Sequence, residues 1–233
     1  MDFTTTIKKY KNPIIMVITL ISIYFIYEYF RPGDTVVEEE SETGDEEETK
    51  DVETDTGIVF ERTDLEKNNV IKAVINNVVD SRLCTKIKNS SGINVSTVEH
   101  LMAALSALGI DNAIVKINTS ELPALDGSSN EYVKKIVNSG IKTLNKSKKI
   151  FKVLKEVKVK SGERFISITP SNRLSINISI NYPDTIIGHS KFFYTHTQDN
   201  FINDLSKART YTLYEDIEKM RTAGLAIGGN LNN

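Results

Sequence analysis

The sequence predicts an α+β protein made of two similar-sized, two-layer units, each an antiparallel sheet with helices packed on it. Three observations support this fold class. Short segments with alternating apolar residues recur after residue 57, helical patterns follow each group of such segments, and Gly or Pro turns separate them. We place the first unit at residues 57–145 and a second, incomplete unit at residues 146–233, because a Lys-rich stretch lies between them.

The amino-terminal residues 1–30 have the pattern of a single membrane-spanning helix. Three lysines precede the uncharged, apolar residues 12–27, and extending this run to Phe30 approaches the roughly 20 residues that a spanning helix needs. A cleaved signal peptide and a buried core helix are the alternatives. No small-residue cleavage site follows the run, and an acidic segment separates it from the rest of the chain, so we expect a membrane anchor.

The next segment, residues 31–56, is an acidic linker. Its residues 38–55 hold eleven acidic side chains and one Lys, too few apolar groups to fold, so it should be a disordered tether. Of the chain's net charge of −2, residues 38–55 carry −10 and residues 1–37 carry +1, which leaves +7 on residues 56–233. This basic body favours an anionic ligand, and we expect no nucleic-acid partner. The single cysteine, Cys84, excludes an internal disulfide.

In the first unit, apolar periodicity sets the expected elements. Strands are expected at residues 58–62, 73–79, 83–88 and 112–118. A helix should begin at Ser96 and Thr97 and end at Gly109, because apolar residues recur between them at helical spacing. Residues 121–129 should form a loop with turns at Pro123 and Asp126, and a short helix over residues 131–138 should follow.

In the second unit, three segments alternate at period two and are expected to be strands: residues 151–159, 164–169 and 173–181. Two helices should follow, over residues 199–208 and 214–223, the second closed by Gly224.

Glu99 and His100, at the start of the first expected helix, admit two interpretations. Ser96 and Glu99 fit a capping box, in which the Glu side chain returns to the N-cap amide and His100 has no special role. Alternatively, Glu99 is a general base beside an imidazole that binds a metal. Spacing alone favours the capping interpretation, because a catalytic zinc site usually takes three protein ligands.

A longer set of motifs resembles one enzyme family. The run STVEHLMAAL at residues 96–105 closely resembles the UDP-3-O-acyl-N-acetylglucosamine deacetylases, the zinc amidases of lipid A synthesis. Further matches follow in the family's order: TGIVF at 56–60, RTDL at 62–65, RLCT at 82–85, ELP at 121–123, DGS at 126–128, ARTY at 208–211, DIE at 216–218 and GLAIGG at 224–229. The resemblance covers about residues 56–233.

The resemblance implies a function and a set of site residues. The reaction would be zinc-dependent hydrolysis of the 2-acetamido group of a UDP-linked, 3-O-acylated glucosamine. His100 would be a zinc ligand, Glu99 the general base for the attacking water, and Thr210 a donor to the oxyanion. Four further positions match the family's substrate-lining residues: Leu83, Tyr211, Ile217 and Ala226. Cys84 matches a position beside the metal.

Two departures from the family weaken this assignment. The family's opening Gly-x-Gly-Leu-His turn has no counterpart here, nor do its His-Lys-x-x-Asp motif and a later catalytic His. Neither His189 nor His196 is followed four residues later by Asp, so we expect both to be ordinary residues. One of three expected Zn²⁺ ligands is then present. We expect the sequence to be part of a longer protein and inactive alone; the alternative is a non-catalytic, membrane-tethered relative that acts as a binding or scaffold module.

The cellular location is predicted from two signals that disagree. Lysines before residues 12–27 and acids after them favour a single-pass protein with its body outside the cytosol. A nucleotide-sugar substrate, implied by the resemblance, favours a membrane-anchored body in the cytosol, and we adopt this prediction.

Overall fold

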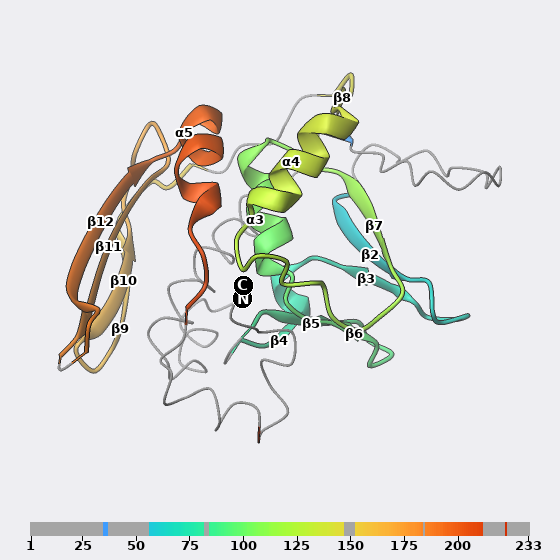
Figure 1. Ribbon diagram of the computed structural model, residues 1–233, viewed down its shortest axis with the longest axis horizontal. Coiled ribbons are helices and arrows are strands. Elements are labelled where there is room, and N and C mark those ends of the chain that lie inside the picture. The colour runs from blue at the N-terminus through green and yellow to red at the C-terminus, as the bar shows by residue number, and fades with distance from the viewer. Residues whose placement is uncertain are drawn as a thin grey trace.

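A computed structural model of the chain describes residues 35–36, 56–81, 84–146, 152–183, 185–211 and 222. Helices and strands are mixed along the sequence (Figure 1), which confirms the α+β class. Helices α3 (Glu99–Ala107) and α4 (Asn130–Ser139) lie beside the strands that precede residue 118. The four strands between residues 157 and 195 lie apart from them, on the other side of α5 (Gln198–Asn203).

The first sheet has β2 (Ile58–Arg62) at its centre, between β3 (Val70–Lys72) and β7 (Ala113–Ile117). The pairing of β2 with β3 is antiparallel, but the pairing of β2 with β7 is parallel, with Ile58 opposite Ala113. The expectation of purely antiparallel sheets is therefore wrong here. A parallel pair needs a crossover connection, and the chain between β2 and β7 supplies one that includes α3.

The second sheet consists of three short strands, β4 (Val78–Asp80), β5 (Lys86–Lys88) and β6 (Asn94–Val95). The single strand expected over residues 73–79 is wrong, because a 3₁₀ helix, η1 (Ile75–Asn77), interrupts it. Asn77 closes this turn: its backbone N–H donates to Val74 O at 2.8 Å and its side-chain amide donates to Lys72 O at 2.8 Å. Asn side chains compete with strand pairing in this way.

Two helices, α3 (Glu99–Ala107) and α4 (Asn130–Ser139), pack against each other and on the sheets. Gly109 and Gly140 follow them with φ of 77° and 85°, left-handed conformations that glycine adopts without strain. The buried face of α3 supplies the centre of the core, together with residues from β2, β3, β5, β7 and α4. Its fully buried members include Phe60, Ile71, Ile87, Val95, Val98, Met102 and Ile110.

The residues that we assigned to a second unit contain two antiparallel hairpins. β9 (Val157–Ser161) pairs with β10 (Arg164–Ile168), and β11 (Ser175–Tyr182) pairs with β12 (Gly188–Thr195). Strand β12 was not expected from the sequence, because Lys, Phe, Phe and Tyr at its centre break the alternation of apolar and polar residues. A further pair joins β1 (Thr35–Val36) to β8 (Lys142–Thr143).

The helix expected over residues 199–208 is split into α5 (Gln198–Asn203) and the 3₁₀ helix η2 (Leu205–Lys207). Thr197 caps α5, because its side-chain oxygen accepts from the backbone N–H of Asn200. Phe201 is 2% exposed and packs into the core of the first unit. This short helix therefore connects the second group of strands to the first core, while the boundary between residues 145 and 146 stays a prediction.

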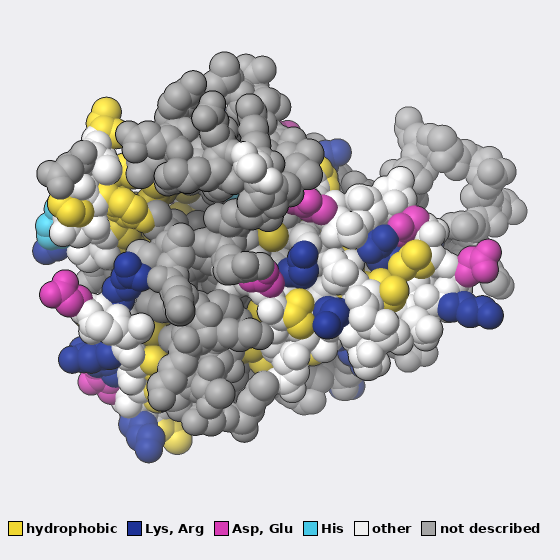
Figure 2. All heavy atoms as spheres, turned by 90° about the horizontal axis from the view of Figure 1, so that it is seen from below, with side chains coloured by type: hydrophobic (Ala, Val, Ile, Leu, Met, Phe, Trp, Pro, Cys, Tyr) yellow, Lys and Arg dark blue, Asp and Glu magenta, His cyan; other side chains and the backbone are white. Residues whose placement is uncertain are grey.

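Several expected segments lie outside the described residues. They are the anchor at residues 1–30, most of the linker at residues 31–56, and the helix at residues 214–223 apart from Thr222. Within the part of the chain that the structure describes, no helix has the length and apolar character needed to cross a bilayer. On the face drawn in Figure 2, the coloured Lys and Arg side chains are dispersed among acidic and apolar ones.

Candidate active site

The chain enters α3 through a residue with an unusual backbone conformation. Thr97 has φ of 61°, in the left-handed region that β-branched residues rarely adopt, and it is 8% exposed. On its amino-terminal side, Ser96 is bonded to the loop at residues 120–122: its N–H donates to Ser120 O at 2.9 Å and its carbonyl accepts from Leu122 N at 3.1 Å. The start of α3 is thus fixed to a loop more than twenty residues later.

Glu99 does not form the expected capping box. The N-cap of α3 is Val98, no side chain caps it, and the N–H of Ser96 is bonded to Ser120 instead. The carboxylate of Glu99 turns away and accepts a hydrogen bond from the backbone N–H of Thr85, with 2.8 Å between Oε2 and N. The capping interpretation is therefore wrong, and the side chain that was expected to stabilise a helix end is a carboxylate held in a buried position.

Burial changes the acidity of Glu99. The residue is 7% exposed, and this loss of hydration raises the pKa of its carboxyl to about 7. Hydrogen bonds from backbone amides, including that of Thr85, oppose the shift, and the negative charge of Glu121 adds to it. A carboxyl with a pKa near 7 can take up and release a proton at neutral pH.

His100, the next residue, is half-buried and lies near the carboxylate of Asp126. Burial lowers the pKa of the His100 imidazole, and Asp126 partly opposes this shift. Burial also disfavours the charged form of Asp126, but hydrogen bonds, chiefly from Ser128, and the charge of Arg209 together lower the pKa of Asp126. His100 is accordingly neutral at pH 7, the form that can bind a metal.

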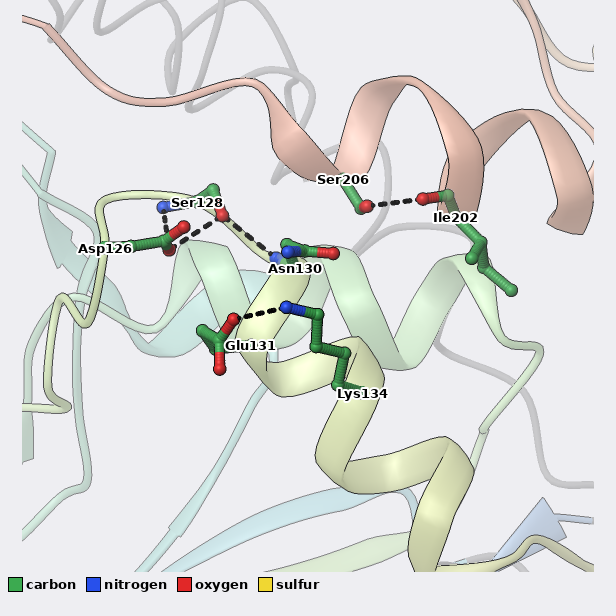
Figure 3. A network of polar contacts seen from close by, with 7 residues as sticks. All are labelled: Asp126, Ser128, Asn130, Glu131, Lys134, Ile202 and Ser206. Atoms are coloured by element: carbon green, nitrogen blue, oxygen red, sulfur yellow. Dashed lines mark hydrogen bonds and ion pairs between the residues drawn. The ribbon is translucent and has the colours of Figure 1, made fainter.

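The turn that carries Asp126 is built from its own hydrogen bonds. Asp126 Oδ1 accepts from the backbone N–H of Ser128 at 3.1 Å and from its hydroxyl at 2.8 Å, and Ser128 Oγ accepts from Asn130 N at 3.1 Å. Figure 3 shows this network leading from Asp126 into the first turn of α4, with Ser206 on the neighbouring element above it. The loop expected at residues 121–129 is confirmed.

Thr210 is brought to the same turn by backbone contacts. Its N–H donates to Gly127 O at 2.8 Å, and the guanidinium of Arg209 donates through Nε to Asp126 O at 2.7 Å. The N–H of Ser129 is bonded to Ser206 O at 3.1 Å. Residues 206–210 are therefore attached along the turn that also places a carboxylate near His100, so the turn at residues 126–129 lies close to His100 and to Thr210.

The expected substrate-lining residues are only partly described. Tyr211 is 45% exposed and lies beside Tyr182 of β11, whose pKa is raised to about 12 by burial and by this neighbour. Leu83, Ile217 and Ala226 lie outside the described residues. Cys84 is half-buried, and burial raises the pKa of its thiol, with the charge of Glu99 adding to the effect.

The described residues do not form the three-ligand zinc site that the resemblance implies. Within residues 56–81, 84–146, 152–183 and 185–211, no three His, Cys, Asp or Glu side chains lie together in a way that could hold a metal ion. His189 pairs with Ser179 at 3.2 Å and His196 with Tyr194 at 3.0 Å, both on the β11–β12 hairpin. Of the ligands that the resemblance implies, this part of the chain therefore supplies only His100, and a catalytic zinc site usually takes three.

Sequence reasoning missed two contributors to the site. The Thr85 N–H that fixes Glu99 leaves no signal in the sequence, because every residue type except Pro has this donor. Glu121 was noted only within a motif, yet its carboxylate accepts a hydrogen bond from the Thr97 hydroxyl at 2.8 Å. Its place beside Pro123 in a loop gave no indication of this contact.

The sequence of this chain is similar to those of proteins from one enzyme family. A family model described as UDP-3-O-acyl N-acetylglycosamine deacetylase matches residues 47–233. A protein of Wigglesworthia glossinidia brevipalpis named UDP-3-O-acyl-N-acetylglucosamine deacetylase is 41% identical over 180 residues, which are 76% of this chain and 60% of that relative. Proteins of the same name from Nautilia profundicola and Campylobacter fetus are 38% and 35% identical, over 77% and 78% of this chain and 60% and 61% of theirs. The chain thus spans about 60% of the length of these curated relatives.

Proposed function

The chain belongs to the UDP-3-O-acyl-N-acetylglucosamine deacetylase family, and from this premise we propose that its residues serve hydrolysis of the 2-acetamido group of UDP-3-O-acyl-N-acetylglucosamine in lipid A synthesis. The observation that carries the proposal is the buried carboxylate of Glu99. It is fixed by the Thr85 amide, and its pKa of about 7 suits a base that works at neutral pH.

The first proposed step uses Glu99 as general base. The Glu99 carboxylate accepts a proton from a water molecule as the water oxygen attacks the acetamide carbonyl carbon. The hydrogen bond from the Thr85 N–H occupies Oε2 and stabilises the charged form. The carboxylate is thereby held in one orientation before the substrate arrives, which lowers the entropic cost of reaching the reactive geometry.

The second proposed contribution comes from Thr210. Attack on the carbonyl places negative charge on its oxygen, and a hydroxyl held nearby by the Thr210–Gly127 backbone bond can donate to it. Tyr211, next along the chain and 45% exposed, is proposed to contact the substrate together with Leu83, Ile217 and Ala226.

Zinc enters this proposal only as a property of the family. His100 is proposed as one ligand, but the described residues supply no set of three, so neither step above depends on the metal. The same observation favours the second candidate function, a non-catalytic relative that binds the acylated nucleotide sugar without hydrolysing it. Binding of the substrate without acetate release would distinguish this function from the first.

Membrane attachment is also part of the proposal. The apolar residues 12–27 and the acidic residues 38–55 support a single-pass anchor joined by a tether to the folded body. We place the body in the cytosol, where a nucleotide-sugar substrate would be available.

The test compares two proteins in an acetate-release assay on UDP-3-O-acyl-N-acetylglucosamine. One is the chain itself, and the other is a chimera in which it is joined to the part of the Wigglesworthia relative that the match does not cover. We expect the chimera to release acetate and the chain alone to release none. In the chimera, Glu99→Gln should lower turnover by about 10²–10⁴-fold without unfolding the protein, whereas Glu131→Gln, on the exposed face of α4, should leave it unchanged.

Two results would count against deacetylation. A folded chimera without activity, while the intact relative is active under the same conditions, would remove the proposed reaction. Full turnover by the Glu99→Gln chimera would remove the role of Glu99 as base.

A further inference from the structure

Glu121 and Thr97 form a contact that the proposed chemistry does not use. The Thr97 hydroxyl donates to Glu121 Oε1 at 2.8 Å. The Thr97 side chain also lies near the Cys84 thiol and opposes the upward shift of its pKa. Glu121 itself lies on the surface of the loop, while Thr97 is 8% exposed. A hydrogen bond to a carboxylate is roughly twice as strong as one between neutral groups.

The contact between Glu121 and Thr97 involves a residue with a strained backbone, because Thr97 is β-branched and has a positive φ. A β-branched residue at φ of 61° is strained and persists only where several contacts hold it in this conformation. Here the surroundings are identified. Two backbone bonds hold Ser96 to residues 120 and 122, and Glu121, between them, holds the Thr97 side chain.

The direction of α3 depends on this conformation. Thr97 is the last residue before the N-cap Val98, whose N–H donates to Thr85 O at 3.4 Å. Glu99 follows, and its Oε2 is then within 2.8 Å of Thr85 N. If residue 97 returned to negative φ, the chain would enter the helix along another direction and the bond between Glu99 and Thr85 would be lost.

We propose that Glu121 is a positioning residue: by accepting the Thr97 hydroxyl, it holds residue 97 in the left-handed conformation that places the Glu99 carboxylate and the His100 imidazole. Glu121 does not touch the reacting atoms in this proposal. The role rests on the proposed function of Glu99, but the geometry it predicts can be measured without substrate.

The experiment follows the Thr85 amide by NMR in the full chain at one fixed pH, because this N–H reports directly on the position of the Glu99 carboxylate. Glu121→Ala should reduce its hydrogen-exchange protection by about tenfold or more. Glu121→Gln keeps an acceptor oxygen and should retain the protection. Thr97→Val removes the same hydrogen bond from the other side and should behave like Glu121→Ala. Glu131→Ala removes an exposed carboxylate of α4 and should have no effect.

A second background separates positioning from general stability. Glycine adopts φ of 61° without strain, so in a Thr97→Gly chain the further change Glu121→Ala should alter Thr85 protection less than twofold. The Ala113 N–H, which donates to Gly57 O at 3.2 Å in the first sheet, serves as reference for global unfolding.

Each outcome decides the proposal. The proposal is supported if Glu121→Ala reduces the protection of the Thr85 amide and leaves that of the Ala113 amide unchanged, and does so only in the chain that retains Thr97. The proposal is overturned if Glu121→Ala leaves the protection of the Thr85 amide unchanged. It is also overturned if Glu121→Ala reduces this protection equally in the Thr97 and Thr97→Gly chains. If Glu121→Ala also reduces the protection of the Ala113 amide, the same comparison of Thr85 with Ala113 is made in Thr97→Val, which removes the same hydrogen bond. Because no substrate is present, a failed deacetylation assay would refute the proposed function and leave this result standing.

Discussion

Glu99 couples the chemistry of the site to the stability of the fold. Its pKa of about 7 in the folded chain lies above its ordinary value of 4.5, so the folded state binds the proton more tightly than the unfolded state does. Glu99 therefore favours folding most at low pH. Its contribution is lost as pH rises from about 4.5 through 7, because a buried carboxylate must then carry a charge.

This coupling predicts a pH-dependent effect of one substitution. Glu99→Gln should raise the free energy of unfolding at pH 8 by up to about 3 kcal/mol relative to its effect at pH 4.5, since glutamine has no charge to bury. Chemical denaturation of both proteins at the two pH values measures the difference. A difference that does not change with pH would show that the carboxylate is well hydrated and that its pKa is ordinary.

The sequence could predict some residues of the site and not others. Glu99, His100 and Thr210 stand in recognisable motifs, whereas the partners that orient them are backbone groups of Thr85 and Gly127. These partners are brought in by tertiary structure, for which a single sequence carries no local pattern. The capping box failed for the same reason: it satisfied every local rule, but the tertiary partner Ser120 took the amide of Ser96.

At the scale of elements, local periodicity predicted strands and helices more reliably than it predicted their pairing. β2, β10 and α4 were found within one residue of their expected bounds, because alternating or helical apolar positions stand between clear turns. The parallel pairing of β2 with β7 was missed, since pairing over such a distance is decided by the core. Thr97 at φ of 61° was also unpredictable, because a β-branched residue gives no reason to expect it.

Helix α5 provides a prediction at this scale. Phe201 is 2% exposed within the core that α3 and β2 share, so Phe201→Ala should lower the free energy of unfolding by about 3–5 kcal/mol. Phe193 on β12 is 66% exposed and is the matched control; Phe193→Ala should change stability by less than about 0.5 kcal/mol. Equal effects of the two changes in urea unfolding would show that α5 does not dock on the first unit.

At the scale of the whole molecule, metal content follows from the number of ligands. All three histidines and the cysteine lie in described parts of the chain, and no three ligand-type residues there lie together. We therefore expect the purified full chain to retain well below one zinc per molecule after dialysis, and His100→Ala to change this little. Elemental analysis measures it. Stoichiometric zinc that disappears in His100→Ala would show a complete site.

The proposed membrane anchor gives a second prediction for the whole chain. Deleting residues 1–30 should move the protein from the membrane fraction to the supernatant, because Val52 is the one aliphatic side chain among the acidic residues 38–55. Fractionation of cells that produce each form measures this. Release of the undeleted chain by alkaline carbonate would indicate peripheral attachment in place of a spanning helix.

The parallel pairing of β2 with β7 also governs the order in which the protein can be assembled during its synthesis. Gly57 bonds to the side chain of Asn112, 55 residues later, and Ile58 lies opposite Ala113. At a translation rate of about 5–20 residues per second, the apolar strand β2 waits roughly 3–11 s before its partner is made. During this interval its apolar edge is open to other chains. The nascent protein should therefore need a chaperone at this stage, and slowing translation between codons 62 and 113 should increase its aggregation.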